Sequence, residues 1–431
     1  MAEIRPEIMK SLKRNIFANL LDGGFFGLAL GFSSFITVLP LFVSTLTDSP
    51  ILIGLIPAIH MIGWQLPQLL TVRSVSRQRR FKPMVMLMTI HERLPFLGLA
   101  IVAFFSTAID PRLTLFLTFL MLIWQGLGGG FTATAWQSMI GKIIPSNRRG
   151  TFYGAQSAAA NLLSSLSAVL AGVILERLSS PTDYSLLFLL AGLSMGVSYF
   201  FLSMTIEPEN APVEPEIEPE RFWHGLRTIL REDRNFRWFL AARMLSQLAV
   251  MGFAFYTVYG VRNHGLSEGT VGIMTAVMLG AEIAVNPLVG WMGDKWSHRA
   301  ALSIGVAAAA TSAFLAWWAP GPSWFYLIFA TAGIAYAALW TASLAMILEF
   351  GSETQRPAYI GLANTLIAPA TILAPFLGGW LADIAGYPAA FLASLVSGLA
   401  TLAVLQIYVK DPRGLPKGIP VQTEQEATCC D

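Results

Sequence analysis

Five acidic or basic side chains, apart from histidines, stand within long apolar segments of this 431-residue sequence. They are Asp22, Glu92, Arg93, Arg243 and Glu282. A charge among apolar side chains is costly unless it is paired or neutralised. A partly desolvated carboxylate can take up a proton, which makes Asp22 a candidate for a proton-binding residue. The equal alternative is a structural ion pair of Asp22 with Arg93 or Arg243, and Glu282 suits either role, with Arg243 as a possible partner.

Neutral polar and aromatic side chains in the same segments suit a pocket for a small organic molecule. Each is equally suited to packing between helices, and His60 and His91 are expected to be hydrogen-bonded core residues. No group of His, Cys, Asp or Glu has metal-site spacing, and no phosphate loop follows a strand. We therefore expect no metal, no other cofactor, no ATP-driven pump and no enzyme. The pocket candidates are Gln125, Gln137, Gln247, Tyr256, Trp340 and Asn364.

The stretch GWMGDKWSHR, residues 290–299, ends a long apolar segment in a group of charges. Gly290 lacks a side chain, so a neighbouring helix can come close to it. Asp294 can meet a helix N-terminus, where the helix dipole favours an anion. Lys295 and Arg299 suit an anchor at a membrane surface. A simple anchor does not need Asp294, so the stretch favours a contact that forms and breaks.

Composition identifies the surroundings of these residues as a lipid bilayer. Hydrophobic residues make up 55% of the chain and charged residues only 13%, whereas a soluble domain carries about 25% charged residues. A helix needs about 20 apolar residues to span a bilayer. The sequence predicts an all-α membrane protein with twelve such spans. They are 15–43, 51–72, 83–106, 113–141, 151–176, 184–206, 238–262, 269–292, 300–319, 324–348, 358–383 and 388–408.

The basic residues predict the orientation, because cytoplasmic loops carry an excess of Lys and Arg. Of the 28 Lys and Arg residues, we place Arg112, Arg177 and Arg262 on one side and two within spans, which leaves 23 on the other. Both termini are therefore expected in the cytoplasm. The net charge of +2 reflects this asymmetry rather than nucleic-acid binding.

The chain is predicted to consist of two six-helix repeats. The stretch RRGTFYG aligns with QRPAYIG at an offset of 207 residues, and Arg149 then aligns with Arg356. Two repeats of the same orientation are typical of secondary transporters. The predicted parts are a bundle over 1–206, a cytoplasmic linker over 207–237, a bundle over 238–409 and a cytoplasmic tail over 410–431. Apolar residues at helical spacing in the linker, among them Trp223, Leu226 and Ile229, predict an amphipathic helix on the membrane surface.

These features resemble the major facilitator superfamily over nearly the full chain. Gly290, Asp294, Lys295 and Arg299 match its signature after the eighth span, although Ser297 stands where the family usually has Gly. The resemblance implies a contact of Asp294 with the start of the fifth span near Arg149, across the boundary between the halves. It also implies that spans 1, 4, 7 and 10 line a central cavity, so that Asp22 and Arg243 can face it, and Asp22 is then the first candidate for the proton-binding residue.

The sequence therefore predicts a secondary active transporter that moves a small solute by alternating access, with proton coupling. The alternatives are a facilitative uniporter or drug exporter of the same fold, and a non-transporting sensor or scaffold. The expected partners are the solute, protons and the lipid bilayer, and the expected state is a monomer. Short outer loops and the lack of Asn-x-Ser/Thr sites are compatible with a bacterial plasma membrane. Cys429 and Cys430 are expected to have no structural role.

Overall fold

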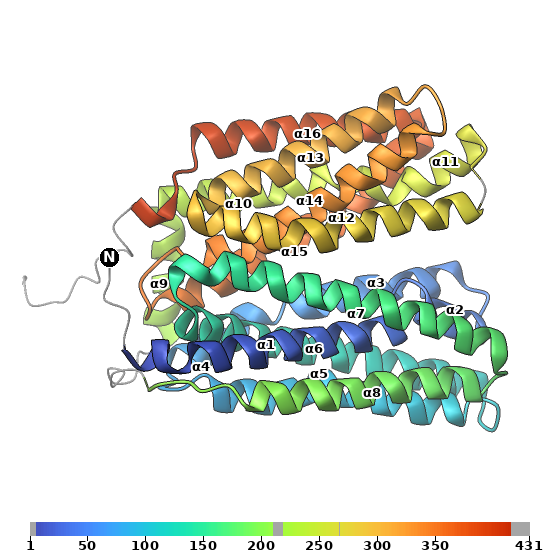
Figure 1. Cartoon of the computed structure of the whole chain (residues 1–431), viewed down its shortest axis with the longest axis horizontal. Coiled ribbons are helices and arrows are strands. Elements are labelled where there is room, and N and C mark those ends of the chain that lie inside the picture. Colours follow the sequence, from blue (N-terminus) through green and yellow to red (C-terminus); the bar gives the residue numbers. More distant parts are fainter. Residues whose placement is uncertain (1–5, 210–218, 267, 415–431) are drawn as a thin grey trace, which may run out of the picture.

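The computed structural model describes residues 6–209, 219–266 and 268–414, and Cys429 and Cys430 lie outside them. All regular secondary structure in these ranges is helical. Figure 1 shows two helical bundles side by side, with most helices along the long axis. The first bundle comprises α1 (Pro6–Phe32), α2 (Val38–Ser44), α3 (Pro50–Gln65), α4 (Gln68–Ser76), α5 (Lys82–Phe104), α6 (Pro111–Ile143), η1 (Ser146–Arg148), α7 (Arg149–Arg177) and α8 (Thr182–Ser203).

The second bundle follows the connecting helix α9 (Pro219–Glu232). The beginning of α1 and the last described helix lie at the same end of the molecule (Figure 1). The second bundle comprises α10 (Arg234–Ala249), η2 (Met251–Phe255), α11 (Tyr256–His264), α12 (Glu268–Lys295), α13 (His298–Trp318), α14 (Trp324–Ile347), α15 (Arg356–Ala385) and α16 (Tyr387–Ile407), and η3 (Pro412–Gly414) comes after it.

Eleven helical stretches of the described chain are long and apolar enough to cross a membrane. The expected span 51–72 is instead divided into α3, with 16 residues, and α4, with 9. The division falls at Pro67, which has no amide hydrogen to donate to a helix. The first span of each half is also interrupted, between α1 and α2 and at η2.

Helix α9 occupies the expected position of the linker helix. Leu226 and Ile229 are buried in the core cluster at the basic end of the molecule, while Trp223 is 46% exposed. Part of the apolar face that the sequence assigned to the membrane surface therefore packs on the protein itself.

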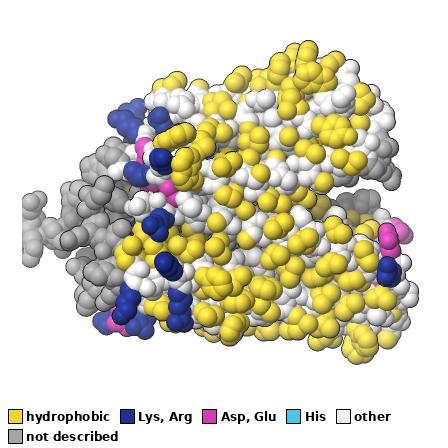
Figure 2. All heavy atoms as spheres, viewed as in Figure 1, with side chains coloured by type: hydrophobic (Ala, Val, Ile, Leu, Met, Phe, Trp, Pro, Cys, Tyr) yellow, Lys and Arg dark blue, Asp and Glu magenta, His cyan; other side chains and the backbone are white. Residues whose placement is uncertain are grey.

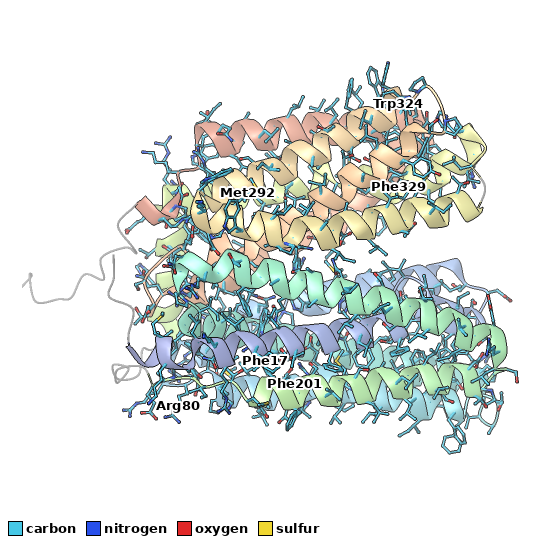
Figure 3. All side chains as sticks on the ribbon, viewed as in Figure 1. Phe17, Arg80, Phe201, Met292, Trp324 and Phe329 are labelled. Carbon is cyan, nitrogen blue, oxygen red and sulfur yellow. The ribbon has the colours of Figure 1, made fainter. Side chains whose placement is uncertain are left out.

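The outer surface has the pattern of a membrane protein. Apolar side chains cover the middle of the molecule, and Lys and Arg gather at one end (Figure 2). Arg80 lies at this basic end, and Trp324 and Phe329 lie toward the opposite end (Figure 3). Phe376 is 72% exposed, and contact with lipid would remove this apolar area from water.

Glycines allow the two bundles to touch where α7 crosses α12. A Cβ atom added at Gly290 would overlap the carbonyl oxygen of Gly150, and one added at Gly154 would overlap that of Asn286. This close approach brings the end of α12 against the start of α7, where the charged stretch of α12 lies.

Candidate gate and intramembrane polar sites

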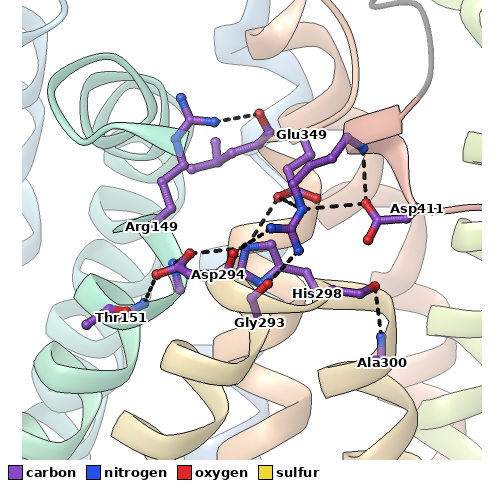
Figure 4. Close-up of polar contacts among 12 residues, drawn as sticks. Arg149, Thr151, Gly293, Asp294, His298, Ala300, Glu349 and Asp411 are labelled. Atoms are coloured by element: carbon purple, nitrogen blue, oxygen red, sulfur yellow. Dashed lines mark hydrogen bonds and ion pairs between the residues drawn. The ribbon is translucent and has the colours of Figure 1, made fainter. Parts of the chain in front are cut away.

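Asp294, near the end of α12, binds the first turn of α7. Its Oδ1 accepts a hydrogen bond from the amide of Gly150 at 2.8 Å, and its Oδ2 accepts one from the amide of Thr151 at 2.6 Å. The first amides of a helix have no partner within the helix, and the helix dipole favours an anion there. Asp294 thus joins the second bundle to the first through two charge-assisted bonds (Figure 4).

Three further ionisable side chains, His298, Glu349 and Arg413, lie next to Asp294 or to one another. Nε2 of His298 lies 3.4 Å from Oδ1 of Asp294 and 3.3 Å from Oε1 of Glu349. Burial raises the pKa of Glu349 to about 7, against the opposing effect of His298 and Arg413. Glu349 can therefore exchange a proton near neutral pH.

Arg413 of η3 completes this group of ionisable side chains at the basic end of the molecule. Its Nε lies 3.2 Å from Oε1 of Glu349. Its Nη1 donates to the carbonyl oxygen of Asp294 at 2.8 Å, and its Nη2 donates to that of Gly293. The segment after the last helix is thus bonded to both α12 and the end of α14 (Figure 4).

The other signature residues anchor the same end of α12 and α13. The ammonium group of Lys295 lies 4.9 Å from the ring centre of Trp291. Arg299 donates to the carbonyl oxygen of Val409 at 2.8 Å. Ser297, in the place of the family's usual Gly, caps α13 by accepting from the amide of Ala300 at 3.2 Å. These contacts lie within the second bundle, so Asp294 alone of the signature side chains reaches across.

Arg149 and Arg356 make reciprocal contacts between the bundles. Arg149 donates to the carbonyl oxygen of Leu348 in the second bundle at 3.1 Å. Arg356 donates to that of Gly141 in the first bundle at 3.2 Å. The offset of 207 residues relates both the two arginines and the two carbonyls. The pseudo-symmetry of the repeats therefore extends to the bonds that hold their basic ends together.

The break between α3 and α4 is filled by a side chain of the other bundle. In a continuous helix, the amide of Leu69 would bond to the carbonyl of Gln65. Instead Oγ1 of Thr365 on α15 accepts from the Leu69 amide at 3.1 Å and donates to the Gln65 carbonyl at 3.2 Å. Such an insertion into the helical hydrogen-bond ladder is a recognised cause of a kink.

Asp22 lies inside the first bundle, in the ion pair that the sequence left open as the alternative. Its Oδ1 is 2.9 Å from Nη2 of Arg93 and accepts from Ser198 at 2.6 Å. Oε2 of Glu92 lies 3.6 Å from the same guanidinium group. The three charges are buried between α1, α5 and α8. The role of Asp22 in proton binding stays a prediction.

Arg243 and Glu282 do not pair with each other or with another charged residue within the described ranges. Arg243 donates to the carbonyl of Ala363 at 3.1 Å and to Oδ1 of Asn364 at 3.3 Å. Oε2 of Glu282 accepts from Nδ2 of Asn161 on α7 at 2.9 Å. Both charges therefore lie close to the boundary between the bundles.

The neutral candidates divide into two groups. Asn364 donates to Oε1 of Gln68 at 2.8 Å and to Oε1 of Gln137 at 3.4 Å, across the boundary. Gln247 accepts from Thr371, which in turn accepts from Gln65 of the first bundle. These residues form a polar layer between the halves.

Trp340 also lies at the boundary, since its ring centre is 5.7 Å from that of Trp64. Gln125, by contrast, is buried inside the first bundle, 3.0 Å from Nδ1 of His60. Tyr256 is 1% exposed in an aromatic core cluster with Phe391. The structure thus places Gln125 and Tyr256 away from the polar layer.

Sequence reasoning missed Glu349, Arg413 and Thr365. An acidic residue directly after a predicted span, on the basic side, was an available signal for Glu349. Pro67 was an available signal for the helix break. No local pattern indicated which residue of α15 fills that break.

The two helical bundles, the apolar belt and the polar contacts between the bundles define a multi-pass membrane transporter fold. A sequence profile described as Major Facilitator Superfamily matches residues 21–261 and 257–429. The chain belongs to the major facilitator superfamily.

Curated relatives match shorter stretches. The vesicular acetylcholine transporter of Mus musculus is 29% identical over 159 residues, which cover 35% of this chain and 30% of that protein. An uncharacterised transporter of the same superfamily from Mycobacterium tuberculosis is 23% identical over 222 residues, half of each chain. The matches thus span a third to a half of these relatives.

Solved structures match nearly the whole chain. A bacterial homologue of the iron transporter ferroportin, in an outward-facing state, has a TM-score of 0.73 at 13% identity, covering 91% of this chain and 99% of that one. A proton:xylose symporter has a TM-score of 0.67 at 15% identity, covering 93% and 97%. At these identities the likeness shows the fold.

Proposed function

We propose that this protein is a secondary active transporter that moves a small solute across the membrane by alternating access, with proton coupling. It has twelve spans, with α3 and α4 together forming the second, and both termini are cytoplasmic. It works as a monomer in a bacterial plasma membrane. The two bundles rock about a site near the bilayer midplane.

The observation that carries the proposal is the difference between the two ends of the molecule. At the basic end, Asp294, Arg149 and Arg356 bond across the two bundles. At the opposite end, Figure 2 shows the surface hollowed between the bundles. Because cytoplasmic surfaces are basic, this arrangement supports a state that is closed to the cytoplasm and open outward.

The hydrogen bonds between the bundles at the basic end can break and form again. They join side chains to helix ends and backbone carbonyls, which water can replace when the bundles separate. Each is worth about 1.5 to 3 kcal/mol when one group is charged. A small number of such bonds can hold one state without making the other inaccessible.

We assign proton coupling to Glu282 rather than to Asp22, because the Asp22 carboxylate is already paired with Arg93. The exposed residues Gly280, Ala284 and Leu288 mark the lipid face of α12, and Glu282 projects from the opposite face. Its Oε2 has a single neutral donor, Asn161, in the other bundle. A carboxylate without a cation in such surroundings is readily neutralised by a proton, and its bond to Asn161 links that proton to the relative position of the bundles.

Distances between spin labels test alternating access directly. Cys429 and Cys430 are first replaced by Ser. One labelled pair joins Arg80→Cys to Arg237→Cys at the basic end, and the other joins Arg112→Cys to Arg262→Cys at the outer end. We expect two populations in reconstituted protein, with the basic-end distance longer whenever the outer-end distance is shorter.

Two substitutions sharpen this test. Asp294→Asn removes the charge that binds α7, so the population with a longer basic-end distance should rise. Glu282→Gln should remove the response of the two populations to pH, whereas Asp22→Asn should leave it in place. A single distance distribution in every variant and at every pH would show that the protein is not an alternating-access transporter.

A further inference from the structure

Arg243 has spare hydrogen-bond donors inside the membrane. It lies in α10, roughly 13 Å along the helix axis from Arg234. Both of its hydrogen bonds use Nη1, and both acceptors are neutral. Its Nε and Nη2 donate to no group of the described chain. Neither atom is fully buried, so both keep some accessible surface.

The other arginines of the membrane region have different surroundings. Arg93 has two carboxylates within 3.6 Å. Arg149 donates to three backbone carbonyls at the cytoplasmic end. Arg243 has neither arrangement; besides its two neutral acceptors, its guanidinium group has within the described ranges only the ring of Phe239, whose centre lies 5.9 Å from its Cζ. A guanidinium group stays protonated in proteins, and a charge without a counterion in a bilayer costs several kcal/mol. An anion from outside the chain would therefore supply the counterion that Arg243 lacks among the described residues.

A second unpaired donor belongs to the same polar layer. Gln137 is fully buried, and its Nε2 has no acceptor among the residues described. Its Oε1 accepts from Asn364, whose Oδ1 also accepts from Arg243. Buried donors without a partner are rare in folded proteins. Arg243 and Gln137 are thus linked through one residue; the unused donors of Arg243 are accessible, whereas that of Gln137 is buried.

We propose that Arg243 binds the anionic group of an organic substrate, a carboxylate, phosphate or sulfonate. This inference rests on the proposed transport function and names its substrate class. Nε and Nη2 of a guanidinium group form a fork that binds two oxygens of such a group at once. The anion reaches the site from the outward hollow and supplies the acceptors that Arg243 lacks.

Anion binding at this site acts on the contact between the bundles. Asn364 joins Arg243 to Gln68 and Gln137 of the first bundle. An anion that draws the guanidinium group toward itself takes one donor from Asn364. The amide then loses part of the network that orients it toward the first bundle, which loosens the polar layer when substrate is present.

Thermal stability of the purified full chain in a neutral, lipid-free detergent tests the proposal. The probes are matched sets that differ in charge: phenylacetate, phenethylamine and phenylethanol; succinate, diaminobutane and butanediol; glycerol phosphate and glycerol; and taurine-type sulfonates. A ligand that binds only the folded state raises the melting temperature. We expect the stabilising compounds to be anions.

Three variants identify the residue responsible. Arg243→Gln removes the charge, Arg243→Lys keeps the charge but loses the fork, and Arg237→Gln is the control at an exposed position of the same helix. We expect the apparent Kd of the stabilising anion to rise at least tenfold in R243Q, less in R243K, and to stay unchanged in R237Q. R243K also serves if R243Q does not fold.

Several outcomes overturn the proposal. They are stabilisation by amines or alcohols rather than anions, equal stabilisation of R243Q and the wild type by anions, and the lack of any anion that stabilises the wild type. Stabilisation by phosphatidylglycerol alone, added in a parallel sample, shows a lipid site instead and also overturns it. If an amine or alcohol stabilises the protein instead, the anion proposal fails but the proposed transport function stands. The transport function itself is tested separately, by the spin-label distances.

Discussion

A buried carboxyl group at the end of α14, Glu349, connects a proton equilibrium to the closed basic end. It is 3% exposed and lies between His298 of α13 and Arg413 of η3, with Asp411 nearby. Burial disfavours its charged form, and His298 and Arg413 only partly offset that cost. At neutral pH the site therefore lies close to the balance between its two protonation states.

The stability of the protein should depend on this residue between about pH 4.5 and 7. The folded protein holds the Glu349 proton more tightly, with a pKa of about 7 against an ordinary value of 4.5. The free energy of unfolding is thus highest below pH 4.5 and falls as the pH rises toward 7, by roughly 3 kcal/mol at most. Denaturation of Glu349→Gln should lack this part of the pH dependence.

Glu209→Gln is the matched control for that experiment. Glu209 forms an exposed ion pair with Arg80 at the same end of the molecule, and such pairs contribute little to stability. If the wild type and Glu349→Gln show the same pH dependence, Glu349 does not titrate in this range.

At the scale of elements, the break between α3 and α4 depends on a hydroxyl group from the other bundle. Thr365→Val keeps the shape of the side chain but leaves the amide of Leu69 and the carbonyl of Gln65 without a partner. Each lost bond costs about 1 kcal/mol, so the closed population at the basic end should fall about tenfold or more relative to the open one. The Arg80–Arg237 label pair measures this ratio.

Thr331→Val provides the control for the loss of a hydroxyl group. Thr331 is half-buried on α14, and its hydroxyl bonds only to carbonyls of its own helix. Its substitution should leave the label distances unchanged. Equal effects of the two substitutions would mean that the hydroxyl of Thr365 has no special role at the boundary.

At the scale of the whole molecule, the reciprocal bonds of Arg149 and Arg356 predict that each half contributes a similar free energy to the closed state of the basic end. Arg149→Gln and Arg356→Gln should each shift the label populations toward the open state, by similar amounts of about 1.5 to 3 kcal/mol. Arg148→Gln, at the exposed neighbouring position, should have no effect. A large effect of one arginine and none of the other would show that the symmetry is geometric only.

The sequence predicted the helical segments well because apolar length alone defines a membrane span. Asp294 was also predictable, since its position after Gly290 matches a family signature that implies its partner. The pairing of Asp22 with Arg93 was one of two alternatives, because helix spacing does not determine which helices are neighbours. The insertion of Thr365 into another helix and the reach of Arg413 are long-range contacts, and no local pattern encodes them.

The position of Arg413 in the chain has a consequence for biosynthesis. Its bonds to Gly293, Asp294 and Glu349 join residues on both sides of the last two long helices. The ribosome must therefore complete α15 and α16 before these bonds can form. Until then the ends of α12 and α14 lack the bonds to Arg413. A chain stopped before Arg413 should therefore insert both bundles into the membrane, with the closed state of the basic end less stable.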